Sequence, residues 1–181
     1  MEKIIYQGKI IEVVEKEISR NGKNQTFESA RRSPGVRLII LKDDKILLSK
    51  EFRYELNGYD LRLPGGKVYD LLNEYNEAIR NNVDINKIAE KAAIKEASEE
   101  TGIVVEDISF FHKSVCGATI NWDLFYFIVN NFKDGSQNLE EGEDITFDYF
   151  TIKDVKEMCL NGLIQEERSA LVLLRYINSL Y

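Results

Sequence analysis

Residues 92–103 read AAIKEASEETGI, and this stretch decides how the rest of the chain is understood. On a helix, Glu96, Glu99 and Glu100 stand at i, i+3 and i+4, so all three side chains project from one side. Like charges at this spacing repel by roughly 0.2–0.5 kcal/mol per pair, and the dipole at a helix C-terminus disfavours them further. A bound Mg2+ reverses this effect because it needs hard oxygen ligands. The stretch therefore predicts a functional carboxylate site.

The helix that carries these glutamates is predicted to cover residues 85–101, with Asp84 as its N-cap and Gly102 as its C-terminal stop. Apolar residues precede Glu96 at three- and four-residue steps or their multiples, so they share its face. They are Ile85, Ile88, Ala89, Ala92 and Ala93. Glutamates that were merely solvated would face away from this stripe, so the pattern favours a site that packs against the protein.

Length and charge narrow the possible classes of protein. The chain has 181 residues, which fits one domain of ordinary size, and a formal net charge of -7. An acidic chain is poorly suited to a large nucleic-acid footprint, which needs a surplus of Lys and Arg. A small phosphate ligand remains compatible, since a bound cation supplies positive charge locally. We therefore expect no nucleic-acid partner.

The cysteine and histidine content argues against a disulfide framework, a cysteine zinc site and a multi-histidine metal site. Cys116 and Cys159 lack the spacing of a disulfide framework or a cysteine zinc site, and His112 is the only histidine.

The N-terminus lacks the apolar run of a signal peptide, and no later stretch is long enough to span a membrane. We expect a cytoplasmic protein with no membrane partner.

The remaining pattern predicts a sheet between helices. Strands are expected within residues 4–18, 36–41, 46–52, 109–115, 122–129 and 145–151, with a polar hairpin turn at residues 42–45. Further helices are expected after Thr151, ending at Gly162, and over about residues 165–180. Residues 69–82 have no clean period and are interpreted as a partly helical insertion. Strands framed by helices indicate an α/β fold.

The carboxylate stretch and a glycine pair upstream resemble the Nudix box. Residues 65–68 read GGKV, and with residues 92–103 they resemble the family pattern G-x5-E-x7-R-E-U-x-E-E-x-G-U, in which U is aliphatic. The resemblance implies a Nudix-type α/β/α sandwich with a mixed β-sheet and a hydrolase that uses Mg2+ or Mn2+. The site residues that it implies are Glu96 and Glu100 as metal ligands, Glu99 as a further ligand or water-orienting catalytic group, the Gly65 carbonyl as a metal ligand, and Gly66 against the substrate.

The chain departs from the Nudix pattern in the middle of the box. Lys95 stands where the family has arginine, an insertion at about residues 69–84 separates Gly66 from the helix, and no glutamate stands at the first acidic position. In the family, that glutamate and the arginine support the loop together. Their joint loss implies that the insertion supports the loop in another way. Candidate replacements for the missing glutamate are Glu74, Glu77 and Glu90, and the sequence does not choose among them.

The rest of the chain resembles one Nudix branch, the ADP-ribose and nucleoside-diphosphate-sugar pyrophosphatases. Residues 32–35, RSPG, and residues 51–54, EFRY, resemble two segments of that branch whose arginines contact substrate. The resemblance implies substrate binding by Arg32 and Arg53. Two departures are Glu51, where the branch has glutamine, and Arg62, where it usually has glutamate.

An acidic run at residues 140–145 resembles the loop that carries the catalytic base in this branch, so Glu141 or Glu143 is expected to take that role. The branch also implies an N-terminal β extension, residues 1–35, that forms a homodimer, followed by a Nudix hydrolase domain, residues 36–181. The implied substrate is a small nucleoside diphosphate derivative, ADP-ribose or another nucleotide sugar, which is cleaved to a nucleoside monophosphate and a sugar phosphate.

Two other functions stay open at this point. A nucleoside triphosphate pyrophosphatase shares the Nudix box, although the N-terminal strands argue against it. A non-catalytic Nudix-like sensor of nucleotide sugars is the second alternative. Such sensors usually lose the glutamates of the box, and here Glu96, Glu99 and Glu100 are intact.

Overall fold

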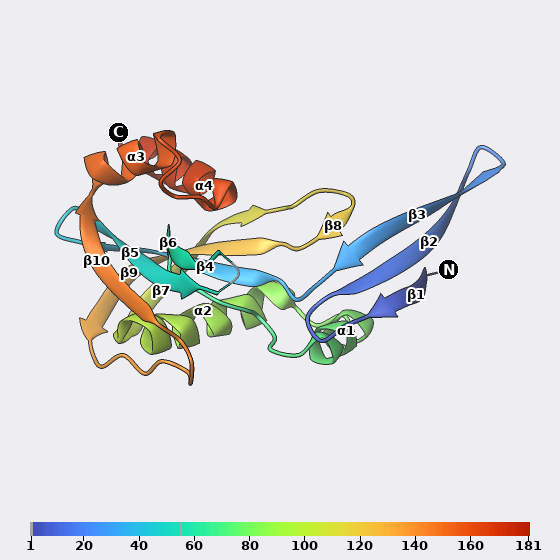
Figure 1. Cartoon of the computed structure of the whole chain (residues 1–181), viewed down its shortest axis with the longest axis horizontal. Helices are drawn as coiled ribbons and strands as arrows, with labels where there is room; N and C mark the ends of the chain where they lie inside the picture. The colour runs from blue at the N-terminus through green and yellow to red at the C-terminus, as the bar shows by residue number, and fades with distance from the viewer. Residues whose placement is uncertain (1, 55) are drawn as a thin grey trace.

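The computed structural model describes residues 2–54 and 56–181, which form two β-sheets with helices packed against them (Figure 1). The larger sheet has the order β10-β5-β4-β9-β7, with β6 paired to β5. Its strands are β4 (Gly35–Lys42), β5 (Lys45–Arg53), β6 (Gly58–Arg62), β7 (Ile103–Ser114), β9 (Leu124–Asp134) and β10 (Ile145–Thr151). Strands β4 and β9 are parallel and the other pairs are antiparallel, so the sheet is mixed.

Strand β4 lies in the middle of this sheet because its side chains suit burial on both faces. Residues 35–40 are all buried, as expected for a strand that is covered on both sides. The hairpin to β5 turns through Asp43 and Asp44, whose φ angles are 51° and 57°. Asp tolerates this left-handed conformation, which a two-residue hairpin loop requires.

Helices cover both faces of the larger sheet (Figure 1). Helix α2 (Ile85–Thr101) packs on the face that contains Leu38 and Ile40. Helices α3 (Ile152–Leu160) and α4 (Glu167–Asn178) pack on the opposite face, which contains Ile39. Alternate residues of β4 therefore enter two separate hydrophobic cores. The predicted α/β/α sandwich with a mixed sheet is confirmed.

The N-terminal strands form a second sheet that projects away from the sandwich (Figure 1). Its order is β1-β2-β3-β8, with β1 (Glu2–Gln7), β2 (Glu12–Arg20), β3 (Lys23–Arg31) and β8 (Ile120–Asn121). The expected N-terminal strand extension is present, but β3 was not expected because its sequence is mostly polar. Asn21 and Gly22, with φ angles of 53° and 71°, close the β2–β3 hairpin. Asn-Gly is a strong hairpin signal, and it was available in the sequence.

The insertion contains helix α1 (Leu72–Arg80), which lies beside the N-terminal sheet and away from the C-terminal end of α2 (Figure 1). Asn76 donates from Nδ2 to Glu12 Oε2 at 3.0 Å, and Arg31 donates from Nε to Glu12 Oε1 at 2.6 Å. The Glu12 side chain is fully buried. Through the hydrogen bond between Asn76 and Glu12, the insertion connects the N-terminal sheet to the segment that follows the glycine pair. In the described part of the chain, no helix is long and apolar enough to cross a membrane.

Candidate active site

The glutamates lie at the C-terminal end of α2, where its buried stripe meets the sheet. Ala89, Ala93 and Ala97 have no exposed surface, and Glu100 continues the same stripe with 7% exposure. The caps are those predicted: the Asp84 side chain accepts a hydrogen bond from Asn86 N, and Gly102 is left-handed with a φ angle of 68°. Small alanines let the helix approach the sheet closely, which holds the last helical turn in place.

The glycine pair runs beside β4, which positions it against the glutamates. The amide of Val36 donates to the Gly66 carbonyl at 3.0 Å, and Gly65 donates its own N–H to Glu100 Oε2 at 2.8 Å. Gly65 has a φ angle of 140°, and a Cβ on it would lie 2.2 Å from the Val36 oxygen. A Cβ on Gly66 would lie 2.0 Å from Glu96 Oε1. Glycine is therefore required at position 65, where backbone atoms occupy the space of a side chain, whereas a side chain at position 66 would displace the carboxylate of Glu96.

Burial changes the acidity of two of these carboxyls. Burial raises the pKa of Glu96 to about 7, and the charges of Glu99 and Glu143 add to the rise, while Lys95 opposes it. Burial raises the pKa of Glu100 to about 8, and the hydrogen bond from Gly65 opposes it. The positive charge and hydrogen-bond donors around these two side chains therefore do not offset the effect of burial on their ionised forms. Such strongly shifted groups in a cleft are typical of functional sites.

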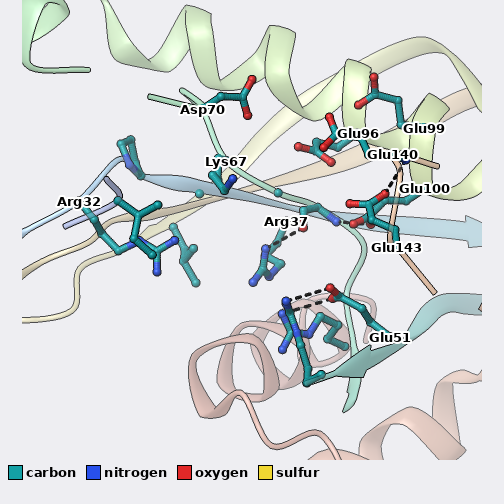
Figure 2. Close-up of a pocket in the computed structure, with 18 of the residues that line it drawn as sticks. Arg32, Arg37, Glu51, Lys67, Asp70, Glu96, Glu99, Glu100, Glu140 and Glu143 are labelled. Atoms are coloured by element: carbon teal, nitrogen blue, oxygen red, sulfur yellow. Dashed lines mark hydrogen bonds and ion pairs between the residues drawn. The ribbon is translucent and has the colours of Figure 1, made fainter. Parts of the chain in front are cut away.

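A cavity of about 570 Å³ opens beside this cluster (Figure 2). One side is acidic and is lined by Glu96, Glu99, Glu100, Glu140 and Glu143. The other side is mainly basic, since Arg32, Arg37, Arg53 and Arg62 line it together with Glu51, which pairs with Arg53. Figure 2 shows these five glutamates gathered around the end of α2, with Arg32, Arg37 and Glu51 lying away from them on the other side of the cavity. The volume is in the range of small-molecule sites.

Most residues predicted from the sequence meet in this cavity. The glutamates of α2, both glycines, Arg32, Arg53 and Glu143 line it, whereas Glu141 is exposed and does not. Arg53 pairs with Glu51, with 2.8 Å between Nη1 and Oε1. The Arg32 guanidinium lies 4.5 Å from the centre of the Trp122 ring. None of Glu74, Glu77 and Glu90, the proposed substitutes for the missing box glutamate, lines the cavity.

Several lining residues were not singled out from the sequence. Arg37, Asp70, Glu140 and Ile10 all line the cavity, and Ile10 comes from the turn between β1 and β2. One signal was available: Arg37 is a lone charge inside the apolar run of residues 36–41. A buried charge is costly without partners, so such a residue commonly has a functional reason.

The donor set fits a hard divalent cation. Glu96 and Glu100 supply buried carboxylate oxygens with little compensating charge, which suits a cation such as Mg2+. Glu99 is turned toward Lys95, with 2.8 Å between Oε2 and Nζ. Among residues 2–54 and 56–181, no three acidic, histidine or cysteine side chains are already arranged as a metal cluster. In this structure Glu99 is thus engaged with Lys95.

Comparison with known families decides the classification. The family model described as the NUDIX domain matches residues 31–170, which is most of the chain. The chain belongs to the Nudix family. This Nudix hydrolase is accordingly a pyrophosphohydrolase, and its family acts on small nucleotide substrates and typically depends on a divalent metal.

A solved structure supports the same fold for this Nudix hydrolase. The crystal structure of an ADP compounds hydrolase is similar to it, with a TM-score of 0.71 and 18% sequence identity. The similarity covers 97% of this chain and 90% of the other, so it includes the N-terminal sheet. At this identity the likeness concerns the fold. Among curated proteins, none is similar enough in sequence to count as a match.

Proposed function

We propose that this Nudix hydrolase cleaves the pyrophosphate bond of a nucleoside diphosphate derivative, ADP-ribose or another nucleotide sugar. The observation that carries the proposal is the cavity, which has the five carboxylates of α2 and the acidic turn on one side and four arginines with a single carboxylate, Glu51, on the other. A diphosphate has two adjacent anionic groups, one of which can face a cation on the carboxylates while the other faces the arginines. The similar solved structure is that of an ADP compounds hydrolase, which agrees with this substrate class.

In this proposal Glu96, Glu100 and Glu99 hold Mg2+ or Mn2+ together with the Gly65 carbonyl. The Gly65 carbonyl already accepts a hydrogen bond from Arg37 Nη1 at 3.1 Å, and a carbonyl oxygen has a second lone pair for a metal. A cation bound there would supply charge neutralisation of the diphosphate and a more acidic bound water. The Gly65 N–H donates to Glu100 Oε2 at 2.8 Å, which orients the carboxylate of this proposed ligand.

The proton acceptor in this proposal is Glu143. It lines the cavity near Glu96, whose pKa its charge helps to raise, and a general base must lie within reach of the water that it deprotonates. Glu143 Oε2 accepts a hydrogen bond from the Glu140 amide at 2.9 Å, a contact within the acidic turn. Attack by the deprotonated water on one phosphorus would yield a nucleoside monophosphate and a sugar phosphate.

The basic side would bind the rest of the substrate. Arg53 would face the phosphate that is not attacked, and Arg32 would contact the substrate beside the Trp122 ring. Burial lowers the pKa of Arg32, and the neighbouring arginines lower it further. An anion placed among these guanidiniums would relieve their repulsion. Gly66 would let the backbone approach the substrate closely.

A substrate panel tests the proposal. Phosphate release would be followed with Mg2+ and a coupling enzyme: a phosphatase for the monophosphates formed from ADP-ribose, ADP-glucose, GDP-mannose and UDP-glucose, and inorganic pyrophosphatase for the pyrophosphate formed from the nucleoside triphosphates. We expect at least one diphosphate sugar to be turned over faster than every triphosphate. Turnover of triphosphates far faster than that of every diphosphate sugar would instead support a nucleoside triphosphate pyrophosphatase. No turnover of any substrate would support the non-catalytic sensor.

We also propose that residues 1–35 make a homodimer. The N-terminal sheet exposes large apolar side chains on β1, β2 and β3, among them Ile4, Tyr6, Ile18 and Phe27. Exposed apolar side chains and open strand edges are usually covered in a soluble assembly. Sedimentation velocity at about tens of micromolar should give the mass of a dimer, and a monomer at that concentration would contradict this part of the proposal.

A further inference from the structure

Arg37 is an unusual residue for its position. It lies in β4, within the run of residues 35–40 that is buried throughout, and its own exposure is 6%. A charged side chain in such a strand is unfavourable unless hydrogen bonds and an opposite charge compensate it. A residue selected only to fill the core would be apolar, as Ile39 is on the same face of the strand.

Two of the three guanidinium nitrogens of Arg37 are held by the protein. Nε donates to Glu166 Oε2 at 3.2 Å, and Nη1 donates to the carbonyls of Val36 at 2.9 Å and Gly65 at 3.1 Å. Glu166 Oε2 also accepts a hydrogen bond from Ser169 Oγ at 2.6 Å at the start of α4. These contacts fix the plane of the guanidinium.

The third nitrogen, Nη2, has no hydrogen-bond acceptor among residues 2–54 and 56–181. Arg37 lines the cavity, and Figure 2 shows it between the α2 glutamates and Glu51. Gly65 connects it to the acidic side directly, because this one residue donates its N–H to Glu100 and offers its carbonyl to Arg37. On the basic side, burial lowers the pKa of Arg32 and the Arg37 charge lowers it further, whereas burial raises the pKa of Glu51 and the charges of Arg53, Arg62 and Arg37 oppose that rise.

We propose that Arg37 is a substrate-binding residue that donates from Nη2 to a non-bridging oxygen of the diphosphate, with Glu166 as its positioning residue. This role rests on the proposed function, since it assumes a diphosphate between the two sides of the cavity. A guanidinium suits the task because its planar fork keeps donors in fixed directions while other donors are already engaged. Donors that are oriented before the substrate arrives stabilise charge that develops during the reaction.

The test compares Arg37→Met and Arg37→Lys with Glu166→Gln and with the exposed α4 control Arg175→Met. Three quantities are measured for each protein: kcat and KM for the best substrate, the Kd of the non-hydrolysable diphosphate α,β-methylene-ADP with Mg2+ by calorimetry, and the Kd of Mg2+ alone. Melting temperatures identify any variant that fails to fold. If Arg37→Met does not fold, Arg37→Lys is read in its place, because lysine keeps the charge and lacks the fork.

We expect Arg37→Met to weaken binding of α,β-methylene-ADP by about tenfold or more and kcat/KM by about a hundredfold or more, with Mg2+ affinity within about threefold. Arg37→Lys should lose about tenfold in kcat/KM, and Glu166→Gln should raise KM more than it lowers kcat. The control should match the wild type.

Binding of α,β-methylene-ADP at wild-type strength by a folded Arg37 variant would overturn the role of Arg37. A loss of Mg2+ affinity as large as the loss of nucleotide affinity would also overturn it, since Arg37 would then act only by holding the Gly65 loop. If the wild-type protein turned over no diphosphate sugar, the proposed function itself would be contradicted, and with it the role of Arg37.

Discussion

Replacing Glu100 by glutamine removes one negative charge from the site while it preserves shape. The glutamine carbonyl can still accept the hydrogen bond that Gly65 N–H donates to Glu100 Oε2 at 2.8 Å. The substitution therefore separates the charge of the carboxylate from its packing. We expect two opposite effects: a metal-free fold that is as stable as the wild type or more so, and a large loss of activity.

The stability effect follows from the raised pKa. In the unfolded chain the Glu100 carboxyl ionises near its ordinary value of 4.5, whereas in the folded, metal-free protein its pKa is about 8. At a pH between these two pKa values, the Glu100 carboxyl is protonated in the folded state and ionised in the unfolded state. The free energy of unfolding therefore falls as pH rises from 4.5 to about 8. At about 1.36 kcal/mol per pH unit, the loss above that range is at most about 5 kcal/mol. Glutamine cannot ionise, so Glu100→Gln removes this part of the loss.

The activity effect has the opposite sign because the substitution removes a proposed metal ligand. We expect kcat to fall by about a thousandfold or more, which corresponds to about 4 kcal/mol of barrier. The stabilisation that added Mg2+ gives the folded protein should shrink as well, since it depends on the metal affinity of the native state.

The assay is thermal unfolding at about pH 5 and at about pH 8.5, with a chelator and then with Mg2+, beside steady-state kinetics. In a domain of this size each kcal/mol moves the melting temperature by about 2–4 °C, so a difference of a few kcal/mol is easily resolved. Glu90→Gln is the matched control, because Glu90 lies on the same helix but is exposed and does not line the cavity. Near-normal activity in Glu100→Gln, with Mg2+ stabilising it as before, would refute the reasoning.

Three further substitutions have definite expected outcomes. Lys95→Arg should keep activity within about tenfold of the wild type, because Lys95 is half exposed and contacts Glu99 rather than the glycine pair; steady-state kinetics checks this. Gly66→Ala should lower activity by about a hundredfold or more and reduce the thermal shift with Mg2+, because its Cβ would lie 2.0 Å from Glu96 Oε1. Glu12→Gln should lower the free energy of unfolding by about 1–3 kcal/mol in a urea titration, because it weakens a buried pair and disturbs the attachment of α1.

The helix and its carboxylates were predictable because their pattern is local. The positions of Glu96, Glu99 and Glu100 repeat with the period of one helix, and Asp84 and Gly102 mark its ends. Strand β3 and helix α1 were harder. Strand β3 is mostly polar and exposed, so it lacks the alternation that identifies a half-buried strand. Helix α1 buries Asn76, which obscures its apolar period.

The basic side of the cavity depends on contacts between distant segments, which a local pattern does not contain. Arg37 meets Gly65 and Glu166 because the glycine loop runs beside β4 and α4 begins over the same face. Within the acidic turn, Glu143 enters the cavity and Glu141 does not, and this choice depends on the backbone around Gly142, whose φ angle is 92°. Residue spacing alone left these two glutamates equivalent.

The most direct test of the proposed site is a crystal structure with Mn2+ and α,β-methylene ADP-ribose, measured with anomalous scattering from manganese. We predict an anomalous peak between the carboxylates of Glu96 and Glu100 and near the Gly65 carbonyl. We also predict a diphosphate that extends from that peak to Arg37 and Arg53. A peak away from the end of α2, or a diphosphate bound outside this cavity, would contradict the proposed site.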